Sequence, residues 1–212
     1  MITAQKPNIY LFPILLVERK LRNLQLAEKV EKIAEKDVNL AEKVVRSFED
    51  REAKIFGFLT LFKLTRNPEY LKDAVEMAET DEDYLMIVER SEEALPEIAE
   101  MIESSYRKNL AYCVLLEKTG DLNLTTKISD VRLLSASLKR VAMKRHYPES
   151  LRVARMIPDP YYRALALMEL GEKERIDLKD EIAEAVKQVD NAAMRRRLEE
   201  KMKKNINSPK QL

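Results

Sequence analysis

The residue types that most often perform catalysis are scarce in this sequence, and their positions assemble no familiar active site. The chain has one cysteine, Cys113, and one histidine, His146. Cys113 lies in the apolar string AYCVLL with no histidine beside it to remove its proton, so we predict a small core residue rather than a nucleophile. His146 follows Lys144 and Arg145 at the end of an expected helix, which predicts a surface or capping role.

The acidic residues are numerous, but none of them is set apart by its spacing. The densest group, Asp81, Glu82 and Asp83, lacks the glycine turn of a calcium loop and lies where a helix should begin, so it predicts a helix cap with favourable dipole charges. No pair among the 37 acids has a spacing that selects it as a general acid and base. Three glycines exclude glycine-rich phosphate loops. We therefore predict a non-enzymatic protein with no cofactor and no metal.

The elements that this chain does specify are helices, and they recur with a regular spacing. Short amphipathic segments come in pairs that begin roughly every 28 residues, a period that is typical of stacked helix pairs. The expected starts of the pairs are Val38, Pro68, Leu95, Leu122, Pro148 and Leu178.

Local signals support these helix starts. Asn67 precedes Pro68 and Asp159 precedes Pro160, which is the pattern of an N-cap followed by a proline in the first turn. Gly120 follows a basic helix end and predicts a left-handed C-cap. Apolar residues repeat with a period near 3.6, and Ala164 falls on one such stripe, where we expect it to lie close against a neighbouring helix.

The resulting fold class is all-α. We predict 12 to 14 helices of about 9–15 residues, joined by short loops that make successive helices antiparallel neighbours. The pairs should stack into a right-handed α-solenoid.

Residues 151–170, LRVARMIPDPYYRALALMEL, carry a resemblance to known repeat proteins. One helix ends at a short Pro/Asp turn and an Ala/Leu-rich helix follows, so the segment resembles a unit of the tetratricopeptide-like and HEAT-like α-solenoids. Residues 182–194 and 40–53 look like degenerate copies. The resemblance covers residues 38–205 and implies a solenoid fold with a general role in binding other proteins. It transfers no site residues, because the Trp and Gly-Tyr positions of the tetratricopeptide consensus are missing.

The array divides the chain into three expected parts: an N-terminal apolar helical cap at 1–37, the helical-repeat array at 38–205, and a disordered tail at 206–212. The run IYLFPILLV at 9–17 is too short for a membrane span, so it predicts a buried element or a contact between copies.

The composition also bears on the location and source of the protein. A lone cysteine fits a cytoplasmic location. Abundant Lys, Glu and Arg with little Gln, Cys and His is typical of hyperthermophile proteins and predicts a thermophilic archaeal source.

Charge is balanced overall but unevenly distributed. Residues 76–103 hold eleven acids and one base, whereas residues 127–212 hold 20 bases and 13 acids. This pattern predicts a bipolar molecule that attracts a protein partner or a second copy of itself, head to tail. The alternative is a nucleic-acid-associated accessory protein that uses the basic C-terminal half. No membrane partner is expected.

Two groups of side chains are candidates for contact with that partner. Tyrosines recur just after helix breaks, and three consecutive arginines occupy the last helix. The candidates are Tyr70, Tyr84, Tyr106, Tyr161, Tyr162, Arg195, Arg196 and Arg197.

Overall fold

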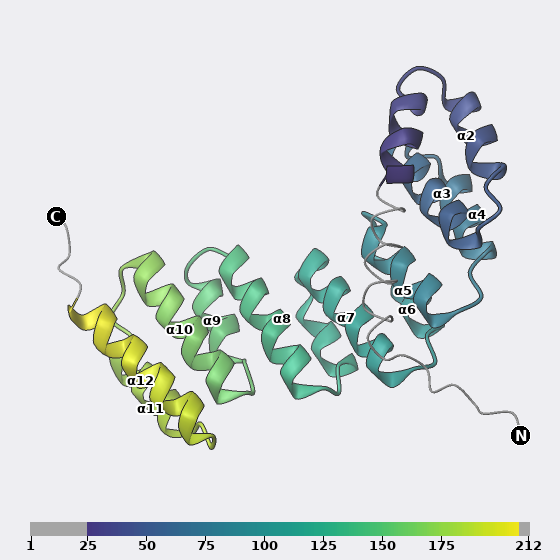
Figure 1. Ribbon diagram of the computed structural model, residues 1–212. Helices are drawn as coiled ribbons and strands as arrows, with labels where there is room; N and C mark the ends of the chain where they lie inside the picture. Colours follow the sequence, from purple (N-terminus) through teal and green to yellow (C-terminus); the bar gives the residue numbers. More distant parts are fainter. Residues whose placement is uncertain (1–24, 208–212) are drawn as a thin grey trace, which may run out of the picture. The chain divides into compact units, whose positions relative to one another are not determined.

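Helices account for nearly all regular structure in this protein. The computed structural model describes residues 25–207, and within them it contains 13 helices and no strand (Figure 1). The all-α prediction and the expected number of helices are therefore confirmed for this part of the chain. The apolar run at 9–17 lies outside the described residues.

The predicted pair starts agree with the structure to within one residue. The first helices of the successive pairs are α2 (Val38–Arg46), α4 (Pro68–Glu76), α6 (Pro96–Glu100), η1 (Leu122–Lys127), α9 (Glu149–Arg155) and α11 (Lys179–Lys187). The second helices are α3 (Arg51–Thr65), α5 (Asp81–Arg90), α7 (Ser105–Thr119), α8 (Val131–Lys144), α10 (Pro160–Glu174) and α12 (Ala192–Asn207).

The predicted helix lengths are wrong for several of the first helices. α6 has 5 residues, α9 has 7, and η1 is a 3-10 helix of 6. Helices this short have no stability of their own, so packing against the longer second helices must hold them in place. At the other end of the chain, α12 continues through Asn207, two residues into the tail expected at 206–212, and residues 208–212 lie outside the described residues.

The described chain divides into two compact units at Glu93 and Ala94. In the first unit, α3 packs against α2, α4 and α5. Residues of α3 are buried on every side of the helix, including Ile55, Phe58 and Phe62. A helix that is apolar all round belongs in the centre of a core, and α3 has that place in this unit.

The second unit, residues 94–212, has two kinds of helix in two roles. The long helices α7, α8, α10 and α12 contact one another in succession, whereas the short elements α6, η1, α9 and α11 each lie against a long helix (Figure 1). We call the row of α7, α8, α10 and α12 the long-helix layer. Ala164 lies in α10 and is fully buried, so its predicted position is confirmed.

A single turn pattern joins the first helix of every pair to the second. An apolar residue is followed by one further residue and then by an N-cap whose side chain accepts a hydrogen bond from the first turn of the long helix. Five of the six apolar residues are buried and Phe48 is half-buried. The N-caps are Asp50, Thr80, Ser104, Asp130, Asp159 and Asn191.

Polar side chains of α7 and α8 bind the turns that precede α8 and α10. Asn109 of α7 accepts a hydrogen bond from the backbone N–H of Ser129 at 2.7 Å, and Ser135 of α8 accepts one from the N–H of Asp159 at 3.1 Å. Both side chains occupy the fifth position after the N-cap of their helix. Each satisfies a backbone group in the following turn that would otherwise be costly to bury, and so fixes the register of the stack.

Several local predictions also agree with the structure. Cys113 is 4% exposed, and burial raises the pKa of its thiol. His146 is exposed at the end of α8. The acids at 81–83 form the first turn of α5, where Asp83 completes a capping box with Thr80. Asp83 is also buried against Arg51, a contact that the sequence did not indicate.

Candidate interaction surface

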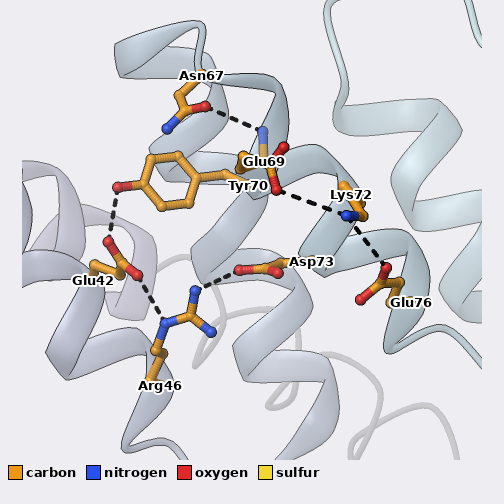
Figure 2. A network of polar contacts seen from close by, with 8 residues as sticks. All are labelled: Glu42, Arg46, Asn67, Glu69, Tyr70, Lys72, Asp73 and Glu76. Carbon is orange, nitrogen blue, oxygen red and sulfur yellow. Dashed lines mark hydrogen bonds and ion pairs between the residues drawn. The ribbon is translucent and has the colours of Figure 1, made fainter.

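Two of the candidate tyrosines serve the packing of the first unit. Tyr70 is 6% exposed, and its hydroxyl donates a hydrogen bond to Glu42 at 3.1 Å (Figure 2). Its ring also stacks on Phe58, with centroids 6.3 Å apart. The half-buried Tyr84 donates to the carbonyl oxygen of Ala78. A partner docking on the folded unit would not reach the Tyr70 ring, because its own unit covers it.

The polar network around Tyr70 joins two successive first helices. Arg46 of α2 donates hydrogen bonds to Glu42 at 2.8 Å and to Asp73 of α4 at 2.6 Å (Figure 2). The Arg46 hydrogen bond lowers the pKa of Glu42, whereas burial and the neighbouring Glu42 raise the pKa of Tyr70. Each of these side chains has a hydrogen-bond partner within the network, so the network holds helices α2 and α4 together inside the first unit.

The other candidate tyrosines belong to the second unit. Tyr106, in the first turn of α7, is 61% exposed. Tyr161 and Tyr162 are half-buried at the start of α10, with their rings edge to face and centroids 5.8 Å apart. These three rings offer aromatic area to solvent, which suits contact with a partner.

The three candidate arginines of α12 differ in their surroundings. Arg195 donates to the carbonyl oxygen of Val189 at 3.0 Å, so it closes the turn before its own helix. Arg196 forms an exposed ion pair with Glu200 at 3.2 Å. Arg197 is exposed. The prediction grouped them by sequence, but neighbouring residues of a helix point in different directions, and only Arg196 and Arg197 present their charge to solvent.

The long-helix layer has an outward face that the sequence interpretation missed. At the seventh residue after each N-cap, all four long helices bury their side chain: Ala111, Ser137, Ala166 and Leu198. At the sixth and tenth residues the side chains are half-buried or exposed instead. They are Leu110, Ala136, Leu165 and Arg197 at the sixth position, and Val114, Arg140, Glu169 and Lys201 at the tenth. Counting from the caps would have revealed this face, because the same register repeats in each helix.

Ion pairs cross this outward face between neighbouring helices. Arg140 of α8 forms an ion pair with Glu117 of α7, and Lys139 of α8 forms one with Glu169 of α10. The N–O distance is 2.7 Å in both pairs. Glu117 also accepts a hydrogen bond from the buried hydroxyl of Ser137. These pairs place α7, α8 and α10 on one continuous surface.

A carboxylate with an unusual environment lies beside η1. Glu100 accepts hydrogen bonds from Lys127 at 2.8 Å and from the Tyr112 hydroxyl, and Lys108 lies 3.6 Å away. These donors, Lys127 foremost, lower the pKa of Glu100 to about 2. Since the pKa of the folded state lies below the ordinary 4.5, the interaction stabilises the fold above that pH and its contribution is lost as the pH falls from 4.5 towards 2.

We expect the Glu100 carboxyl to titrate near pH 2 and the Lys127→Met variant to move its pKa towards 4.5, as followed by carboxyl-carbon NMR. Lys187→Met, on α11, is the matched control and should leave the Glu100 titration unchanged. A wild-type carboxyl that titrates near 4.5 would contradict this assignment.

The polar groups elsewhere in the second unit are arranged for mutual pairing. A surface hollow of about 490 Å³, bordered by α9, α10 and α11, is lined by Arg155, Arg163, Glu181 and Gln188 among others. Arg155 donates two hydrogen bonds of 2.8 Å to the carboxylate of Glu181. Arg163 donates hydrogen bonds to the Gln188 side chain and to the carbonyl oxygen of Ile157. Over residues 25–207, no cluster of three His, Cys, Asp or Glu side chains has the arrangement of a metal site.

The described residues form an all-α protein whose helices pack against their neighbours, an arrangement compatible with a helical-repeat fold. Comparisons with protein-family models, with curated proteins and with solved structures find no match. None of the helices in the described part of the chain is long and apolar enough to cross a membrane.

Proposed function

We propose that this protein is a non-enzymatic scaffold that binds other proteins, with the outward face of the long-helix layer as its main binding surface. The observation that supports this proposal is the repeated register of α7, α8, α10 and α12. It presents half-buried apolar side chains in the same position of successive helices, among them Leu110 and Leu165. Apolar groups in a row on one face are typical of a surface that a partner covers.

The two-layer packing supports an α-solenoid of tetratricopeptide-like or HEAT-like character. Ion pairs between successive first helices, such as Arg46 with Asp73 and Arg155 with Glu181, support a thermophilic and, by composition, archaeal origin, since such networks gain value at high temperature. We place the protein in the cytoplasm on the ground that its lone cysteine is a buried thiol.

One observation favours the nucleic-acid alternative. Arg196, Arg197 and Lys203 are exposed on α12, and residues 94–212 carry 23 basic and 18 acidic residues. Phosphate contacts need such a basic surface. Against this alternative, Glu199 and Glu200 interrupt the cluster, and Arg196 is already paired with Glu200.

The test is affinity purification of the tagged full chain from its native organism, followed by mass spectrometry and nucleic-acid staining. We expect one or a few proteins to be recovered in stoichiometric amount, in both nuclease-treated and untreated extracts. Recovery of nucleic acid, with the proteins lost on nuclease treatment, would replace the proposal with the alternative. Recovery of the tagged chain alone would contradict both.

A further inference from the structure

We propose that the outward face of the long-helix layer binds one helix of a partner protein, and that this helix is amphipathic and acidic on its polar side. This inference rests on the proposed scaffold function and specifies the chemistry of the partner. Three features of the second unit carry it: a strip of apolar side chains, the internal neutralisation of the acids on the face, and exposed arginines at its margins.

The apolar strip crosses three neighbouring helices. Leu110 and Val114 of α7, Ala136 of α8 and Leu165 of α10 are all half-buried, whereas the residues that follow Leu110, Ala136 and Leu165 are buried. Tyr162, three positions after its N-cap, lies beside Leu165 on the same face of α10. All four side chains keep part of their apolar area open to solvent, and that area is available to a partner.

The charges on the face favour an acidic occupant. Arg140 neutralises Glu117 and Lys139 neutralises Glu169, with N–O distances of 2.7 Å in both cases. By contrast, Arg132 in the first turn of α8 and Arg197 of α12 are exposed. The charge left over on this surface is therefore positive, and an acidic partner would complement it.

The geometry of the strip suits a helix. Packed helices lie about 8–10 Å apart, so the apolar strip across α7, α8 and α10 spans roughly 16–20 Å, and the face that also includes Arg197 of α12 spans roughly 25–30 Å. A helix of about 18 residues has that length and repeats its apolar residues along one stripe. A nucleic acid would have to place its phosphates over leucine, valine and alanine side chains and next to two carboxylates. Both the apolar surface and the negative charge disfavour phosphate binding.

The experiment is a selection of random 18-residue peptides displayed on phage against the intact protein. We expect enrichment of sequences with apolar residues at helical spacing and Asp or Glu on the opposite side. A synthetic, fluorescein-labelled copy of the most enriched peptide is then titrated with protein in a fluorescence anisotropy assay. Arg132→Glu together with Arg197→Glu should weaken its affinity by about tenfold or more, because both exposed charges are reversed.

The matched control reverses two exposed charges on the first helices of the pairs, Arg152→Glu and Lys187→Glu, and should retain wild-type affinity. Both double variants replace exposed residues, and circular dichroism and melting will show that they fold. A labelled single-stranded oligonucleotide provides the comparison for nucleic acid.

Three results would overturn the inference. They are no enrichment of acidic amphipathic peptides, equal loss of affinity in the control variant, and oligonucleotide binding that depends on Arg132 and Arg197 without peptide binding. None of these results decides the scaffold function by itself. Recovery of a stoichiometric protein partner from the native organism would still support that function, and the partner would then bind to a different surface of the protein. Conversely, confirmed peptide binding with no protein recovered would contradict the scaffold role in the cell and keep the surface assignment.

Discussion

Replacing Ala164 with arginine is expected to lower the free energy of unfolding by about 3–5 kcal/mol, the cost of leaving an unpaired charge inside a protein. Ala164 is fully buried on α10, at the fifth position after the N-cap Asp159. The equivalent positions hold Asn109 and Ser135, which contact the turn of the next repeat. A guanidinium at this place has no path to water without separating α10 from its neighbours.

Thermal and urea denaturation of the purified variant measure this effect, and the melting temperature should fall by roughly 10 °C or more. Ala193→Arg is the control, because Ala193 is exposed in the first turn of α12 and the same substitution there should change stability by less than about 0.5 kcal/mol. An unchanged melting temperature for Ala164→Arg would mean that α10 does not pack as described.

Replacing Gly57 with alanine should destabilise the first unit by about 1–3 kcal/mol, even though alanine is the better helix former. A Cβ atom at Gly57 would lie 2.7 Å from both γ-carbons of Val45 and 3.2 Å from its Cβ. Valine is branched at Cβ and rarely changes rotamer in a helix, so α2 and α3 would have to move apart. Urea denaturation measures the loss.

Gly171→Ala is the matched control, and its effect should have the opposite sign. A Cβ atom there meets nothing closer than 3.4 Å, so the variant should gain up to about 1 kcal/mol from the higher helix propensity of alanine. The double variant Gly57→Ala/Val45→Ala removes the crowding methyls and should lose less than the two single changes added together. Equal effects at Gly57 and Gly171 would show that α2 and α3 are not in close contact.

The outward face of the long-helix layer illustrates why candidate residues are hard to find from sequence. Tyr161, Tyr162 and Arg197 lie on or beside that face, and the sequence interpretation included them. It also included Tyr70, whose ring turns out to be covered by its contacts with Glu42 and Phe58. It missed Leu110 and Arg140, because single leucines and arginines are common on helices and nothing in one helix shows which of its sides a neighbour covers.

The sequence by itself determined where helices begin. The signals are local: they act through backbone geometry and hydrogen bonds within a few residues, so they can be recognised from the sequence alone. They include Asn67 with Pro68, Asp159 with Pro160, and Gly120. For the same reason the helix starts near Val38, Pro68, Leu95, Leu122, Pro148 and Leu178 and the all-α class were predictable, whereas the position of Ala164 was predicted from the apolar period near 3.6.

Only the tertiary structure decided how these helices are grouped and which sides remain open. The division at Glu93 and Ala94, the buried pair of Asp83 with Arg51, and the five-residue length of α6 depend on contacts between residues far apart in the chain. Such contacts leave no periodic trace in the sequence, because each needs one compatible side chain at one place. The outward face of the long-helix layer is the consequence with most bearing on function, since it exists only where α7, α8, α10 and α12 lie side by side.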